Sequence, residues 1–249
     1  MLRYNVFDRN YGAMLVFRKG DRNVAYGNVF VRGSGGIRIK EANDVVCYNN
    51  YFDACPQALT VDYLDTSFVN NITFLHNTFV NTSFDLTSLL ISKSKKKILL
   101  QNNLFNQFKF GVSRKDFLNQ ALDFEGNAFD QKEEFTELKK LSTNKNLFVL
   151  NETFFRAKTS RNLKFFGLTK SLSVVLSKSK TMVPFYLTNM VDLNEDINQV
   201  VIRGEKLKRD IGCEQFIANH GNNSSPTTTF FKNLNIRRGP SYLTAPLVV

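Results

Sequence analysis

Four cations near the start of the chain combine the residue types and the spacing needed for binding or catalysis. Arg18 and Lys19 lie in "LVFRKGDRNVAYGNVF", and Arg38 and Lys40 lie in "GSGGIRIKEANDVVCYNNYF". Arg18 and Lys40 each lie twelve residues before the Phe that ends their stretch. Cations that recur at a fixed spacing suit an extended polyanion, because each can pair with one anionic group along it.

The Asp, Cys and His residues elsewhere in the sequence give weaker evidence for a catalytic or metal-binding site. Glycoside hydrolysis needs two converging carboxyl groups, but no two Asp residues are adjacent in the sequence. The Asp residues that could serve are more typical of turns: Asp44, Asp53, Asp62 and Asp65. The odd number of cysteines, without metal-ligand spacing, predicts buried free thiols: Cys47, Cys55 and Cys213. With only His76 and His220 present, a histidine-rich metal site is excluded, and no metal ligand is predicted.

The segments that must position these side chains repeat. An Asn-x-Phe pattern occurs six times, and its Phe residues are separated by 23, 22, 27, 26 and 24 positions. Runs such as "GIRI", "DVVCY" and "NITFLH" read as short strands bounded by turn residues, without a helical period. The pairs are Asn5/Phe7, Asn28/Phe30, Asn50/Phe52, Asn77/Phe79, Asn103/Phe105 and Asn127/Phe129. A strand, a turn and a second strand at this period predict one coil of an all-β, single-stranded parallel β-helix.

The repeated Asn and Phe have structural roles in such a solenoid. Stacked Asn side chains hydrogen-bond between coils and satisfy turn backbone groups. One Phe per coil forms an interior aromatic stack. We therefore predict one β-helix domain over residues 1–249, with regular coils to about residue 130 and irregular coils with a C-terminal cap over about 131–249.

Aligning the first two repeats predicts how the cations are arranged. Arg18 falls over Lys40, Val16 over Arg38, and Lys19 over Glu41. Because side chains alternate faces along a strand, Arg38 and Lys40 share a face, and Arg18 stacks beside them. A cation row on an outward face would bind an extended acidic chain. The alternative is a solvated strand edge that keeps the sheet soluble.

Composition limits the kinds of binding partner that the protein is expected to have and gives some indication of its location. The net charge is +11, which favours a polyanionic partner, although a basic surface without function is the alternative. Nucleic acid is not predicted, since the aromatic residues lie in core-like positions and do not alternate with surface cations. No stretch approaches the roughly 20 uncharged apolar residues of a membrane span, so no membrane partner is expected. The opening "MLRYNVFDRNYG" does not resemble a signal peptide.

The first two repeats together resemble the core signature of polysaccharide lyase family six, which includes alginate lyases and chondroitinase B. The stretches that carry the resemblance are "LVFRKGDRNVAYGNVF" and "GSGGIRIKEANDVVCYNNYF". Similarity continues in "NITFLHNTFVN" and "ILLQNNLFN", and sparsely in "RDIGCEQF" and "RRGPSYL". It is dense over residues 2–106 and sparse beyond them.

The resemblance implies a right-handed, pectin-lyase-like β-helix that cleaves uronate polysaccharides by β-elimination. A Lys removes the proton beside the carboxylate, an Arg assists at the leaving oxygen, and calcium commonly neutralises the carboxylate. Arg18 matches the catalytic Arg, Arg38 matches a substrate-contacting cation, and Lys19 stands where the family usually has His. The catalytic Lys and the calcium ligands would fall before Met1, so the chain resembles the later part of such a lyase.

The expected function is therefore a carbon–oxygen lyase acting on alginate or a related glycosaminoglycan, in an incomplete or inactive fragment whose catalysis would be weak or absent. Its catalytic residue would be Arg18, and its substrate-binding residues would be Lys19, Arg38 and Lys40. The alternative is a non-catalytic β-helix that binds acidic glycans. We expect a monomer, and for the full-length protein a secreted or periplasmic location.

Overall fold

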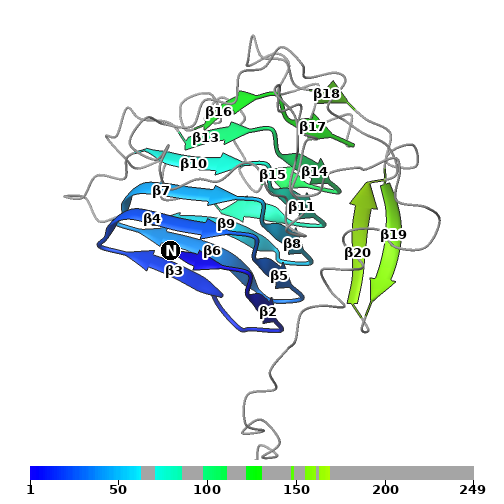
Figure 1. Ribbon diagram of the computed structural model, residues 1–249, viewed down its shortest axis with the longest axis horizontal. Helices are drawn as coiled ribbons and strands as arrows, with labels where there is room; N and C mark the ends of the chain where they lie inside the picture. The colour runs from blue at the N-terminus through cyan, green and yellow to red at the C-terminus, as the bar shows by residue number, and fades with distance from the viewer. Residues whose placement is uncertain are drawn as a thin grey trace, which may run out of the picture.

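The strands of the protein stack as coils of a parallel solenoid (Figure 1). The computed structural model describes residues 1–62, 71–85, 98–110 and 122–130, together with the backbone of residues 147–148, 155–160 and 163–168. Within these ranges no helix is long and apolar enough to cross a membrane. The described part is all-β, as the repeat predicts.

Each complete coil contributes one strand to each of three parallel sheets. Sheet A contains β1 (Leu2–Arg3), β4 (Asp21–Tyr26), β7 (Asn43–Tyr48), β10 (Ile72–Leu75), β13 (Ile98–Gln101) and β16 (Leu122–Glu125). Sheet B contains β2 (Val6–Asp8), β5 (Val29–Val31), β8 (Tyr51–Asp53), β11 (Thr78–Val80), β14 (Leu104–Asn106), β17 (Ala128–Phe129) and β18 (Leu147–Phe148). Sheet C contains β3 (Leu15–Arg18), β6 (Gly35–Lys40), β9 (Gln57–Asp62), β12 (Ser83–Asp85) and β15 (Lys109–Phe110).

The coil therefore has three strands, where the sequence pattern suggested two. The additional strand arises because the Asn-x-Phe segment is itself the short strand of sheet B, separated from sheet A by a tight corner. At that corner one residue per coil takes a positive φ: Tyr4, Gly27, Asn49, His76, Asn102 and Gly126. Hydrogen bonds to the neighbouring coil hold these residues in the left-handed region, as from the His76 N–H to the Gln101 carbonyl at 3.1 Å.

The predicted Asn ladder is confirmed on five successive coil-to-coil steps. At each step the backbone N–H and the Nδ2 of one Asn donate to the Oδ1 of the next, at 2.8–3.1 Å. From Asn28 onward, each Nδ2 also donates to a backbone carbonyl of the preceding coil, as from Asn77 to Cys47 at 2.9 Å. From Asn28 to Asn127 the side chains are buried, so the ladder satisfies polar groups that water does not reach.

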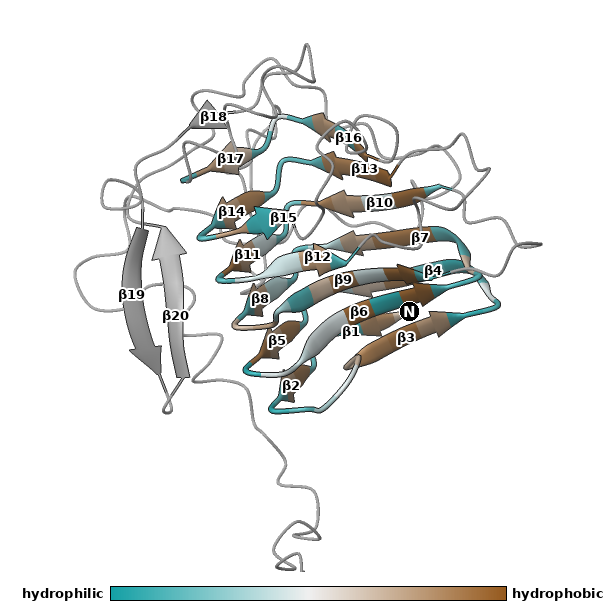
Figure 2. Cartoon of the chain, turned by 180° about the vertical axis from the view of Figure 1, so that it is seen from behind, coloured by the Kyte–Doolittle hydropathy of each residue, from teal (hydrophilic) through white to brown (hydrophobic). Residues whose placement is uncertain are grey.

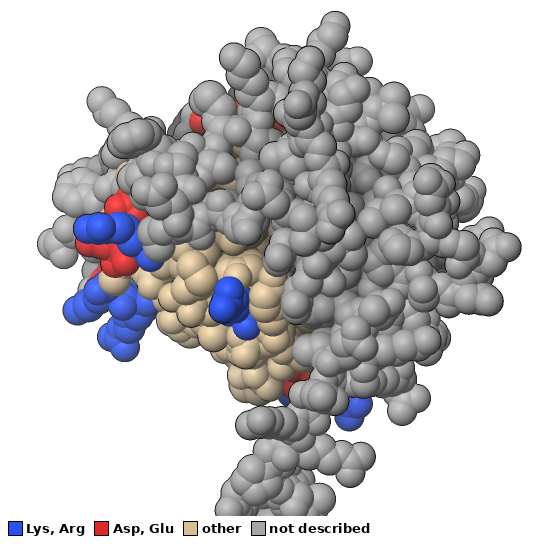
Figure 3. Space-filling view, in the orientation of Figure 1, with Lys and Arg blue, Asp and Glu red and all other residues tan. Residues whose placement is uncertain are grey.

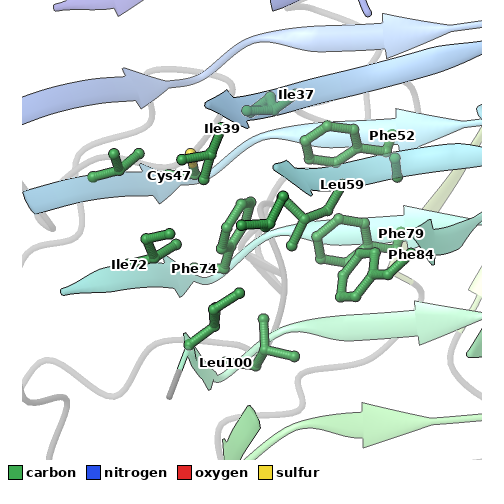
Figure 4. Close-up of a cluster of buried hydrophobic side chains, with 14 of the residues drawn as sticks. Ile37, Ile39, Cys47, Phe52, Leu59, Ile72, Phe74, Phe79, Phe84 and Leu100 are labelled. Carbon is green, nitrogen blue, oxygen red and sulfur yellow. The ribbon is translucent and has the colours of Figure 1, made fainter. Parts of the chain in front are cut away.

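The predicted Phe stack is also confirmed. Successive rings from Phe7 to Phe129 stack at centroid distances of 4.7–5.1 Å with interplanar angles of 2–13°. This separation matches the spacing of hydrogen-bonded strands, roughly 4.8 Å. Inward residues of the three sheets, including Ile37, Phe74 and Leu100, form one core with the stack (Figure 4). The interior thus holds the coils in register and leaves their outer faces for other roles.

The chain after the regular coils is only partly described. Leu147–Phe148 extends sheet B by pairing with β17. β19 (Phe155–Ser160) and β20 (Leu163–Leu168) pair antiparallel with each other and do not extend the parallel sheets. β18 places one strand of the parallel stack after residue 130, and the irregular coils and C-terminal cap expected over about 131–249 stay a prediction.

Candidate anion-binding face

The three sheets differ in how much of their outer faces is accessible. On sheet A the outward side chains of β4, β7 and β10 form a second buried apolar cluster: Val24, Tyr26, Val46, Tyr48 and Leu75. On sheet B the outward residues before the stacked Phe are buried from the second coil onward: Val29, Tyr51, Thr78, Leu104 and Ala128. Sheet C is different, because its outward side chains are exposed or half-buried in all five strands where they are described.

Sheet C faces the viewer in Figure 2, where hydrophobic and hydrophilic residues alternate along β6 and β9. The alternation follows from burial, since Ile37 and Ile39 point into the core while Arg38 between them is exposed. In the opposite view, Figure 3 shows mainly uncharged described residues over sheet A. Charged side chains there gather at the edge where β3 leads into β4 (Figure 3). An approaching polyanion therefore meets the cations on the outer face of sheet C and at the edge where β3 leads into β4.

The strand pairing confirms the predicted alignment of the first two coils. Val16 is the Cα partner of Arg38, and Arg18 is the partner of Lys40. Arg18 and Arg38 are exposed and Lys40 is half-buried, so all three line the outer face of sheet C. Lys19 lies at the corner beyond β3 with φ of 49°. The structure thus brings together all four residues predicted to contact substrate, and their chemical roles remain predictions.

Two of these cations are ion-paired to carboxylates. The Lys19 ammonium lies 3.7 Å from Glu41 Oε2, and the Glu41 side chain is only 7% exposed. The Arg38 guanidinium directs both Nε and Nη2 at Asp62 Oδ2. Arg18 and Lys40 have no ion-pair partner among the described residues. They are therefore the positions on this face where an incoming anion competes least with the protein's own carboxylates.

Sheet C changes character beyond the second coil. The partners of Arg38 and Lys40 on β9 are Thr60 and Asp62. Asp85 on β12 pairs in turn with Thr60, so one row becomes acidic at Asp62 in the third coil and the other, after Thr60, at Asp85 in the fourth. On the fifth coil β15 carries the exposed Lys109, which pairs with Ser83. The sequence interpretation treated Asp62 only as a possible acid or turn residue and missed its contact with Arg38. Counting forward places Asp62 beside Lys40, because positions 18, 40 and 62 are equally spaced by 22 residues, but this spacing does not predict that the carboxylate contacts Arg38.

The other two described carboxyl candidates, Asp44 on β7 and Asp53 on β8, lie away from this face. Asp44, the second residue of β7, has a positive φ and accepts a hydrogen bond from Asn71 Nδ2 at 2.7 Å. Asp53 ends β8 on sheet B, where burial raises the pKa of its carboxyl to about 6, against the lowering effects of the Tyr51 hydroxyl and of Arg32. Asp65 lies outside the described residues.

The described cysteines behave as the spacing predicts. Cys47 and Cys55 are free and buried. Burial raises the pKa of the Cys55 thiol to about 11 and that of Cys47 further, which makes both poor nucleophiles at neutral pH. Cys213 lies outside the described residues. The described ranges contain no group of three or more His, Cys, Asp or Glu side chains arranged to hold a metal ion, so no described residue is assigned to calcium.

Comparison with known proteins supports the architecture. Residues 1–105 match the family model described as right handed beta helix region. No curated protein and no solved structure shows a significant match to the chain. The matched residues include the first four coils, with the ladder as far as Asn103, the stack as far as Phe105 and the cationic part of sheet C. The described coils of this protein are therefore those of a right-handed parallel β-helix.

Proposed function

We propose that the protein holds an acidic, uronate-containing polysaccharide, such as alginate or a related glycosaminoglycan, against the outer face of sheet C and cleaves it by β-elimination. The observation that carries the proposal is the exposed cation row of the first two coils, in which Arg18 and Lys40 lie in register on adjacent strands. Adjacent strands are roughly 4.8 Å apart, so their charges recur along a line. A uronate polymer presents carboxylates along a line as well, which makes it a complementary partner.

The elimination step is supported by the resemblance around Arg18 and by the chemistry of uronates. A base takes the proton from the carbon that bears the carboxylate, the bond from the neighbouring carbon to the leaving sugar oxygen breaks, and a carbon–carbon double bond forms. Arg18 would donate a hydrogen bond to the leaving oxygen, while Lys40 and Arg38 would offset charge that develops on the carboxylate. The proposal assigns no described lysine as the base, and calcium, as in the resembled family, would neutralise the carboxylate when bound.

Binding without cleavage is the second candidate. The ion pairs of Arg38 with Asp62 and of Lys19 with Glu41 favour it, because they engage two of the four cations with the protein's own carboxylates and add no base to the face. Such a protein would recognise the same polymers through the same residues. The two candidates therefore differ only in whether the polymer is cut.

Ultraviolet absorbance of unsaturated uronates distinguishes the candidates, with alginate, polymannuronate and dermatan sulfate offered separately in the presence of calcium. For a lyase we expect absorbance to rise, and the rate to fall about a hundred-fold or more in Arg18→Ala. Arg3→Ala, which removes an exposed Arg from sheet A, should keep the wild-type rate. Binding to the same polymers without any rise in absorbance would overturn the lyase and support the binding protein. Failure to bind any of the three would overturn both.

A further inference from the structure

Over the first four coils the outer face of sheet C changes from basic to acidic along the solenoid axis. One row runs in register through Arg18, Lys40 and Asp62 on three successive coils. The parallel row has Arg38 on the second coil and Asp85 two coils later. An extended acidic chain that lies along the axis therefore meets attraction over the first two coils and repulsion over the next two.

Asp62 occupies the boundary between the two regions. Its backbone pairs with that of Lys40, and its carboxylate accepts both contacts from the Arg38 guanidinium. The Asp62 side chain is 22% exposed and that of Arg38 is 44% exposed, so the pair lies at the surface where a ligand would bind. An anionic group that approaches Arg38 must therefore compete with a carboxylate that is already in place.

We propose that Asp62 determines the specificity of this face by confining an acidic ligand to the first two coils. This inference rests on the proposed function, namely that an acidic glycan binds sheet C. Asp62 neutralises Arg38 and repels ligand carboxylates that would otherwise continue past Lys40. Affinity then comes from a short segment of the polymer, centred on Arg18 and Lys40.

The expected effect follows from the separation of the charges. Asp62 lies one strand spacing, roughly 4.8 Å, beyond Lys40, which is shorter than the screening length of about 8 Å at physiological salt. Pairs of exposed charges contribute at most about a factor of five to an equilibrium constant. Removing the Asp62 charge should therefore tighten binding of an acidic oligosaccharide about two- to five-fold. The gain should shrink at high salt.

Asp62→Asn tests the proposal, with oligomannuronates of increasing length as probes and titration calorimetry at low and high salt as the measurement. We expect Asp62→Asn to bind long oligomers about two- to five-fold more tightly than wild type, with little gain for the shortest binders. Asp123→Asn is the matched control, because it removes the same charge from an exposed position on sheet A. Equal affinities of wild type and Asp62→Asn at every length, or the same gain in Asp123→Asn, would overturn the inference while leaving the proposed function intact.

A second comparison applies even if Asp62→Asn folds poorly. Asp62 already neutralises Arg38, so Arg38→Gln should weaken binding only about two-fold. Arg18→Gln, which removes a cation without an ion-pair partner among the described residues, should weaken binding about five-fold. Equal losses in the two variants would contradict the role of Asp62. Absence of binding in wild type and in Asp62→Asn would instead overturn the proposed function and this inference with it.

Discussion

Truncating one internal rung of the Asn ladder tests how the coils are held together. Asn77 is fully buried, and its Oδ1 accepts hydrogen bonds from the Asn50 backbone N–H at 2.9 Å and from Asn50 Nδ2 at 3.0 Å. Its Nδ2 donates to the Cys47 carbonyl at 2.9 Å and to Asn103 Oδ1 at 3.0 Å. Asn77→Ala removes all four interactions. It leaves the Asn50 backbone N–H and one of the two Nδ2 hydrogens of Asn50 buried without an acceptor, while the other Nδ2 hydrogen stays bonded to the Ala25 carbonyl.

The magnitude follows from these donors. A buried donor without a partner costs about 1–3 kcal/mol, so Asn77→Ala should lower the free energy of unfolding by about 4 kcal/mol. Asn5→Ala is the matched control at the first coil, where Asn5 donates to Arg3 and Asn28 but accepts no ladder hydrogen bond from an earlier coil. Because it orphans no buried donor, it should cost about 1 kcal/mol.

Urea denaturation followed by circular dichroism and tyrosine fluorescence measures both variants. We expect the denaturation midpoint of Asn77→Ala to fall well below that of Asn5→Ala, with a similar dependence on urea. Equal losses of stability in the two variants would refute this prediction. They would mean that the ladder hydrogen bonds contribute little and that other groups stabilise the packing of the coils. A strongly reduced urea dependence would show instead that the coils no longer unfold together.

Two further predictions concern the core and the effect of pH. Phe79→Ala should lower the free energy of unfolding in urea by about 3–5 kcal/mol, because Phe79 stacks on rings in both neighbouring coils. Phe7→Ala at the first coil should lower it by less than half as much. Equal losses would contradict the stacking argument. Burial raises the pKa of Asp53 from 3.8 to about 6, so its contribution to stability is fully present below pH 3.8 and is lost as pH rises through about 6. Relative to Asp53→Asn, wild type should therefore lose about 2–3 kcal/mol of stability over this interval in thermal or urea denaturation, and parallel pH profiles would refute the assignment.

The repeat of residue types was sufficient to predict the interior. A buried Asn and a buried Phe recur once per coil, and each contacts its own counterpart in the next coil, so the sequence period translates directly into contacts. The same reasoning predicted the pairing of Arg18 with Lys40. It succeeded there because the connection after each cation has the same length. Two residues separate β3 from β4, and two residues separate β6 from β7.

The third strand of each coil and the accessibility of the faces were not predicted. Corner residues with positive φ include Tyr4 and His76, neither of which signals a turn by its type, so the boundary between sheets A and B is hidden in the sequence. Alternation distinguishes inward from outward side chains but does not tell whether an outward face is covered. Burial of Tyr48 and Leu75 on the outside of sheet A became known only from the structure.

The contact between Arg38 and Asp62 shows where sequence reasoning reached its limit. Alignment backward from each Phe fails at the third coil, because the spacing from Phe52 to Phe79 is 27 residues and includes the longer connection between β9 and β10. The sequence by itself therefore determined the solenoid, its Asn and Phe interior and the cations of the first two coils, since these depend on local repetition. The tertiary structure alone decided which carboxylate meets which cation and which face stays open, because both depend on strand register between coils and on where the extra residues of each coil are placed.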